Sequence, residues 1–198
     1  MGKTRLEAFS DGVLAVIITI LVLELKVPHS SEFGALVELL PAFLSYVLSF
    51  IFIGIYWNNH HHMFHTVTHV NGAMLWANTH LLFWLSLVPF TAAWMGENHY
   101  EAVPVAAYGV VMLMAGLAYP ILQTVIIRTQ GQGSPLAKAV GKDWKGKASA
   151  AIIIIGIALA FVHPWLACAA YATVAATWLI PDRRIERTLE EDDATANS

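Results

Sequence analysis

Residues 12–23 read GVLAVIITILVL, and this stretch decides the fold class. It is an unbroken apolar run with a single hydroxyl group, that of Thr19. With its flanks, from about Leu6 to Val27, the run is long enough to cross a bilayer, which needs roughly 20 mostly apolar residues. It ends before Pro28, because the residue that precedes a proline avoids the helical conformation. We therefore predict a transmembrane helix here.

The rest of the chain has the same apolar character. Of its 198 residues, 57% are hydrophobic and 13% are charged, whereas a soluble domain carries about 25% charged residues. So little charge cannot cover a globule of this size with water-compatible side chains, and disorder would require low hydrophobicity. The net charge of −3 gives no reason to expect nucleic acid as a partner. We interpret the chain as an integral membrane protein in a lipid bilayer.

Six apolar segments predict an all-α fold with six transmembrane helices per chain. Helices are expected because backbone polar groups in lipid must be satisfied within the segment. The segments run from about Leu6 to Val27, Gly34 to Trp57, Asn71 to Met95, Val103 to Ile127, Ala148 to Val162 and Pro164 to Ile180. The second can continue as a polar extension through the histidines that follow it. The fifth is short, so we expect it to start earlier, near Asp143. Together they form one six-helix transmembrane domain over residues 1–181.

Lysine and arginine residues set the predicted orientation. With the N-terminus in the cytoplasm, that side holds ten of the eleven Lys and Arg residues, and only Lys26 lies opposite. This excess follows the positive-inside rule and places both termini in the cytoplasm. The expected location is the cell (plasma) membrane. Residues 182–198 are acidic, and we expect them to form a disordered cytoplasmic tail.

The first helix carries one candidate functional face. At 100° per residue, four residues of the apolar run share a stripe: Val16, Thr19, Ile20 and Leu23. Arg5 and Phe9 extend this stripe toward the N-terminus. Asp11 faces away from it, toward neighbouring helices, where a carboxylate near the membrane boundary needs a partner. Ordinary helix packing produces the same pattern, so periodicity alone leaves the role of the stripe open.

The second candidate feature is a run of histidines. Residues 57–65 read WNNHHHMFH, and His61, His65 and His69 recur every four residues. On a helix they share one face, and imidazoles at this spacing are able to hold a transition metal. A membrane oxygenase needs several such clusters, whereas the other histidines are scattered singly. We expect interfacial or packing histidines and no metal or cofactor, with a histidine-dependent membrane metalloenzyme as an alternative.

The third segment places Asn78 and His80 inside an otherwise apolar helix. Buried polar side chains in lipid usually form hydrogen bonds to a neighbouring helix. Asp11, a histidine from residues 60–62 and Asn78 are all expected near the cytoplasmic end. The sequence does not separate a network that only joins helices from one that controls a path. A small proton-coupled carrier that uses Asp11 and the histidines is therefore a further alternative.

Residues 5–11 read RLEAFSD and resemble a known signature. Arginine, any three residues and Phe-Ser-Asp open the first helix in the transmembrane protein 175 family of potassium channels. The resemblance continues at Trp57-Asn58-Asn59-His60, at Asn78 and at Pro89, and it covers essentially the whole chain. Within the family, the chain resembles the bacterial members most. On this resemblance the signature and support network comprise Arg5, Phe9, Ser10, Asp11, Trp57, His60 and Asn78.

The resemblance implies a potassium-selective channel rather than an enzyme, with the potassium ion as the permeant species. In the family the first helices line the pore, and a ring of apolar side chains is its narrowest part. By distance from the signature that ring falls on Val16, with Thr19, Ile20 and Leu23 toward the outside. Many members have a bulkier residue there, so either Val16 or Leu23 forms the tightest ring. Animal members carry two six-helix repeats and this chain one, which implies a homotetramer.

Overall fold

The computed structural model describes residues 2–140 and 143–179. As expected, this part of the chain is all-helical, and it contains nine α-helices. They are α1 (Lys3–Leu23), α2 (Phe33–Glu38), α3 (Leu40–His65), α4 (Gly72–Ser86), α5 (Val88–Glu97), α6 (Ala102–Gln130), α7 (Pro135–Val140), α8 (Trp144–Ala160) and α9 (Pro164–Leu179). The acidic tail expected at residues 182–198 lies outside the described residues.

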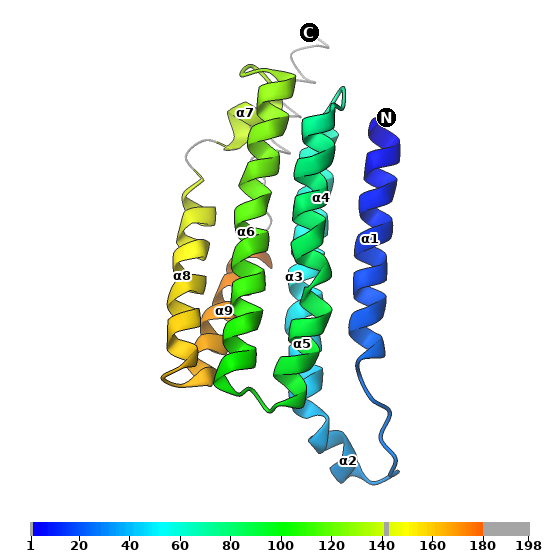
Figure 1. The fold of residues 1–198 in the computed structure, drawn as a ribbon, viewed down its shortest axis with the longest axis vertical. Coiled ribbons are helices and arrows are strands. Elements are labelled where there is room, and N and C mark those ends of the chain that lie inside the picture. Colours follow the sequence, from blue (N-terminus) through cyan, green and yellow to red (C-terminus); the bar gives the residue numbers. More distant parts are fainter. Residues whose placement is uncertain (1, 141–142, 180–198) are drawn as a thin grey trace.

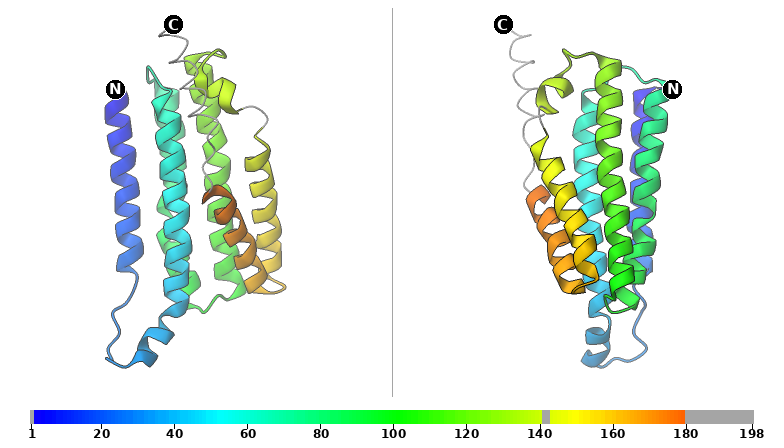
Figure 2. Two further views of the ribbon diagram at one scale, coloured as in Figure 1. Left: turned by 180° about the vertical axis from the view of Figure 1, so that it is seen from behind. Right: turned by 60° about the vertical axis from the view of Figure 1, so that its left-hand side comes forward.

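The long helices run side by side, and α1 lies at one edge of the bundle (Figures 1 and 2). It packs against α3, α4 and α5. The paired helices α8 and α9 lie at the opposite edge and pack against α6, which also contacts α4 and α5. One side of α1 therefore has no neighbour within the described part of the chain.

The prediction of six transmembrane helices per chain is wrong. In the described part, four helical stretches are long and apolar enough to cross a membrane: Lys3–Leu23, Leu40–His65, Gly72–Glu97 and Ala102–Gln130. The two C-terminal helices fall short because α8 has 17 residues and α9 has 16. At a rise of about 1.5 Å per residue they extend about 25 Å, less than the roughly 30 Å of the hydrocarbon core.

Local sequence signals explain where the helices begin and break. The side chain of Asn71 accepts a hydrogen bond from the backbone N–H of Met74 (2.9 Å) and caps α4. Asp143 caps α8 in the same way, so the earlier start expected for that helix is confirmed. The break between α4 and α5 falls at Leu87, just before Pro89, because proline lacks an N–H and its ring crowds the preceding turn.

Small residues allow two close helix contacts in the bundle. A Cβ atom on Gly96 of α5 would lie 2.7 Å from the Cα atom of Ala42 in α3. On Gly109 of α6 it would lie 2.1 Å from the hydroxyl of Tyr171 in α9, which donates a hydrogen bond to the backbone carbonyl of Val105. Small residues at helix crossings are typical of membrane bundles, where close packing replaces the hydrophobic driving force.

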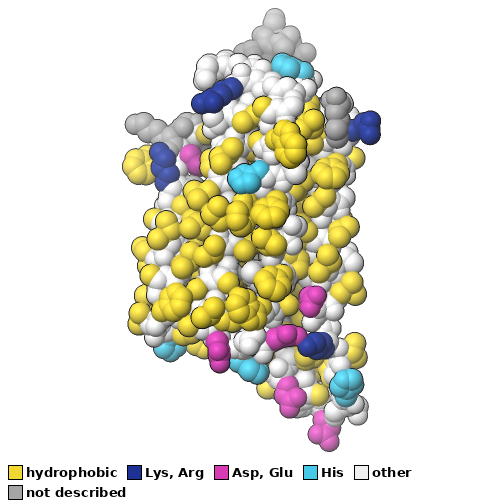
Figure 3. Space-filling view, in the orientation of Figure 1, with side chains coloured by type: hydrophobic (Ala, Val, Ile, Leu, Met, Phe, Trp, Pro, Cys, Tyr) yellow, Lys and Arg dark blue, Asp and Glu magenta, His cyan; other side chains and the backbone are white. Residues whose placement is uncertain are grey.

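The surface of the molecule matches the interpretation of the chain as a membrane protein. Hydrophobic side chains form a broad band across the face in Figure 3, with Lys and Arg mostly above it and Asp and Glu mostly below it. A band of this kind suits contact with lipid acyl chains. The chain is an integral membrane protein.

Candidate pore-lining face and its support network

Helix α1 has two distinct faces. Its buried face packs into the bundle through Leu6, Ser10, Leu14, Ile17 and Leu21. These residues recur every three or four positions, as one face of a helix requires. Val13 and Ile18 are partly buried beside this face, and most of the remaining circumference is exposed. What lies on this exposed side decides what α1 does beyond packing.

The predicted stripe lies on the open side of α1. Val16 is 57% exposed, Ile20 40% and Leu23 74%. Thr19 is also exposed, and its hydroxyl donates a hydrogen bond to the carbonyl of Ala15 (2.9 Å). Because the hydroxyl proton is used within the helix, the lone pairs of the Thr19 oxygen point away from that bond and remain available to a cation.

Phe9 and Arg5 lie toward the N-terminus on the same open side. Phe9 is 52% exposed, and Arg5 is exposed as well. Neither takes part in the buried network described next. The structure therefore divides the signature: Arg5 and Phe9 belong to the open face, whereas Ser10 belongs to the buried face.

Three buried polar side chains meet where α1, α3 and α4 pack together: Ser10 of α1, His60 of α3 and Asn78 of α4. The amide nitrogen of Asn78 donates to the hydroxyl oxygen of Ser10 (2.9 Å), and Ser10 in turn donates to the carbonyl of Leu6 (2.9 Å). The amide oxygen of Asn78 lies 2.8 Å from Nε2 of His60. Since that oxygen only accepts, His60 carries its proton on Nε2 and donates it. Ser10 and Asn78 are fully buried and His60 is 3% exposed, so the network is shielded from solvent.

Asp11 makes a separate contact. It is exposed, and its Oδ1 atom accepts a hydrogen bond from the indole N–H of Trp57 (3.1 Å). The expected meeting of Asp11, a histidine and Asn78 is thus divided into two contacts. Ser10 takes the position by Asn78, and Asp11 pairs with the residue one helical turn before His60. The hydrogen bond between Asp11 and Trp57 joins α1 to α3. The hydrogen bond between Ser10 and Asn78 joins α1 to α4, and Asn78 connects both to His60 of α3.

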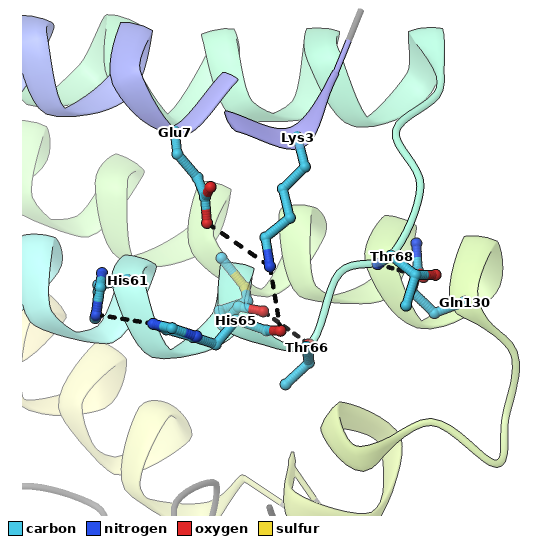
Figure 4. Close-up of polar contacts among 8 residues, drawn as sticks. Lys3, Glu7, His61, His65, Thr66, Thr68 and Gln130 are labelled. Atoms are coloured by element: carbon cyan, nitrogen blue, oxygen red, sulfur yellow. Dashed lines mark hydrogen bonds and ion pairs between the residues drawn. The ribbon is translucent and has the colours of Figure 1, made fainter. Parts of the chain in front are cut away.

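Sequence reasoning did not identify the contacts at the N-terminal end of α1. Lys3 donates to the backbone carbonyl of His65 (3.3 Å) and lies 3.9 Å from Glu7 (Figure 4). A cation at a helix C-terminus compensates the helix dipole. The sequence features that could have predicted this contact are therefore a lysine near the start of α1 and the unpaired carbonyl groups expected at the C-terminus of α3. Beside them, Gln130 accepts hydrogen bonds from Thr68 and joins the α3–α4 connection to the end of α6.

The other end of α1 is also fixed. Lys26, which follows the helix, donates a hydrogen bond to the carboxylate of Glu97 at the end of α5. This hydrogen bond and the charge of Glu97 raise the pKa of Lys26 above its ordinary value. Helix α1 is thus fastened at both ends and at its buried face, and its open face stays free.

The fold and these contacts define an integral membrane protein whose first helix presents an apolar face outward. A family model described as "Endosomal/lysosomal potassium channel TMEM175" matches residues 5–89. A potassium channel from Chryseobacterium sp. (strain P1-3) is 54% identical and covers 97% of this chain and 100% of its own. The chain belongs to the TMEM175 family of ion channels, as the resemblance in the sequence predicted, and it is not an enzyme.

Two further relatives extend the comparison. The crystal structure of a lysosomal potassium-selective channel TMEM175 homolog from Chamaesiphon minutus superposes with a TM-score of 0.79 at 28% identity, over 91% of this chain and 97% of that one. The endosomal/lysosomal proton channel TMEM175 of Gallus gallus is 30% identical over 72% of this chain, which spans 32% of the length of that protein. The metalloenzyme alternative receives no support from the family.

Proposed function

We propose that the chain is a potassium channel and that the open face of α1 lines its pore. The relatives that it covers from end to end are named potassium channels. The observation that carries the assignment to α1 is its exposed apolar stripe, which lies opposite a fully buried polar anchor.

One α1 helix does not enclose a path, so the proposal requires several chains. We propose a homotetramer in which each chain contributes one α1, consistent with α1 lying at the edge of the bundle with one side open. Each stripe residue then occurs in four copies around a common axis. The open face of α1 becomes the inner wall, and α3, α4 and α5 support it from behind.

The proposed selectivity mechanism is an apolar constriction. Rings of Val16, Ile20 and Leu23 offer a passing ion no oxygen atoms, so the ion must shed water against them, and ring width dominates the barrier. Either Val16 or Leu23 forms the tightest ring. Thr19 contributes the only polar atom of the stripe, and its free lone pairs would solvate the ion between the apolar rings.

Orientation follows from the charged residues at the ends of the bundle. Lys3 contacts the end of α3, and Arg128 lies in the last turn of α6, beside Gln130. These basic residues share one end, which we place in the cytoplasm by the positive-inside rule. Lys26, at the other end, would face outward. We propose the cell (plasma) membrane as the location, with both termini cytoplasmic.

Proton conduction is the second candidate, because the matching vertebrate relatives are named proton channels. Purified protein in liposomes separates the two. The liposomes hold a higher potassium concentration inside than outside, contain no ionophore, and have a permeant anion that balances the charge of the moving potassium. Under these conditions we expect potassium efflux with an unchanged internal pH. Sodium in place of potassium should reduce the flux. A change of the internal pH without potassium flux would overturn the proposal in favour of a proton channel.

A further inference from the structure

The histidine run ends in a pair whose geometry differs from that of the other histidines. Nε2 of His61 and Nε2 of His65 lie 3.1 Å apart, and their rings meet edge to face at a centroid distance of 4.5 Å. Both side chains are exposed at the end of α3 (Figure 4). One ring donates its proton to the other, so the free pair shares a single hydrogen between two nitrogen atoms.

This separation matches that of two imidazoles bound to one metal ion. A metal–nitrogen bond of about 2.0–2.1 Å places two such nitrogens about 2.9 Å apart in a square-planar centre and about 3.3 Å apart in a tetrahedral one. Residues four apart on a helix face each other, so α3 already holds the two rings on one side. Both rings are exposed, so they can rotate to aim their lone pairs at a common point.

We propose that His61 and His65 form a binding site for a divalent transition-metal ion of the class that prefers imidazole, such as Cu²⁺, Ni²⁺ or Zn²⁺. The ion replaces the shared proton, which moves to Nδ1 of the donor ring through solvent, so both rings stay neutral. Among residues 2–140 and 143–179, no three His, Cys, Asp or Glu side chains converge on such a site. Water therefore completes the coordination, and the ion exchanges with solvent.

The surroundings connect this site to two hydrogen bonds between α1 and α3, those of Trp57 and His65. His61 stacks on the indole of Trp57 (ring centroids 5.9 Å apart), and Trp57 donates its hydrogen bond to Asp11. The backbone carbonyl of His65 accepts from Lys3, whose ammonium lies beside Glu7. An ion on the two histidines therefore sits between two hydrogen bonds that join α1 to α3. The carboxylates of Asp11 and Glu7 favour a cation there, and Lys3 opposes it.

Cu²⁺ is the probe for the test, because it is paramagnetic and leads the affinity order for nitrogen ligands. Protein without a polyhistidine tag is titrated in nanodiscs and followed by electron spin echo envelope modulation, which counts coordinated imidazoles. We expect one Cu²⁺ per chain with two imidazoles, and quenching of tryptophan fluorescence that Trp57→Phe reduces. A single imidazole or none per ion would overturn the proposal.

Variants assign the ligands. His61→Gln/His65→Gln should weaken Cu²⁺ binding by about tenfold or more, since losing ligands costs at least as much as losing their outer partners. The matched controls are His69→Gln and His29→Gln, which remove exposed histidines that have no imidazole partner in the described part of the chain. Equal binding by the double variant and the controls would contradict the site. Because the readout is binding, the result does not depend on whether the protein conducts potassium.

Discussion

Asn78 is the residue through which the anchor of α1 is organised. Its amide donates to Ser10 and accepts from His60, so one side chain joins α1, α3 and α4. Both amide functions are used, and all three side chains are buried. Leucine at this position would keep the volume but leave the N–H of His60 without an acceptor inside the bundle.

We therefore expect Asn78→Leu to lower the free energy of unfolding by about 1–2 kcal/mol, the cost of a buried donor left unsatisfied between membrane helices. The measurement is denaturant-induced unfolding in detergent micelles. Thr79→Val is the matched control on the same helix, because its hydroxyl is exposed and donates only to its own helix at Leu75. Equal stability of the two variants would show that the network contributes nothing.

At the residue scale, the sequence predicts which residues are polar within apolar helices but not how they pair. Asp11 and Asn78 stand out in the sequence itself, and the resemblance to the family adds Ser10, Trp57 and His60. Their partners depend on the rotation of α1 relative to α3 and α4, a tertiary property that periodicity does not specify. For this reason Ser10, a neutral residue one position from Asp11, takes the buried place beside Asn78.

At the scale of elements, α3 and α5 approach closely where Gly96 faces Ala42. A Cβ atom on Gly96 would lie 2.7 Å from backbone, which cannot turn aside as a side chain can. Gly96→Ala should therefore push α5 away from α3 and cost about 1–3 kcal/mol of stability, as overpacking does. Thermal unfolding in detergent measures the loss.

The control for Gly96→Ala is Gly54→Ala in the middle of α3. A Cβ atom on Gly54 meets nothing within 4 Å. Alanine should be neutral there or stabilise the helix by about 0.5–1 kcal/mol, because glycine loses more backbone entropy on folding. If both variants lost stability equally, the close approach at Gly96 would not be the cause.

Helix α1 gives the second prediction at this scale. In a Cys168→Ala background, cysteine at position 16, 20 or 23 should react with a small cationic thiol reagent, because these positions face a wetted path. Cysteine at buried Leu14 or Ile17 should be protected. Protection at all three stripe positions, in protein that still conducts, would mean that α1 does not line the path.

Much of the element-level structure could be predicted, because helix ends depend on local chemistry. Pro28, Asn71 and Asp143 mark ends or starts that the structure places within a few residues of the prediction. The number of membrane spans could not be predicted, because hydropathy detects apolar segments but does not show whether each one is long enough to cross a bilayer. The helices α8 and α9 are apolar and pack against each other, and yet each is too short.

For the whole molecule, one experiment tests an even number of subunits and the proposed orientation together. Two copies are joined by a short polar linker from Ser198 of the first to Met1 of the second. If both termini are cytoplasmic, the linker stays on one side of the membrane and the tandem chain assembles. If they lie on opposite sides, the linker would have to cross roughly 30 Å of hydrocarbon, and potassium flux should be lost.

The tandem also tests whether the α1 helices of different chains form one shared ring. Deleting methyl groups from an apolar ring admits water and weakens the discrimination between potassium and sodium. We expect Leu23→Ala or Val16→Ala in every chain to raise sodium permeability, and Leu23→Ala in only one half of the tandem to give an intermediate value. Val22→Ala, which lies off the stripe, should leave the ratio unchanged in either form. The same ratio in half-substituted and fully substituted tandems would mean that the α1 helices do not form one shared ring.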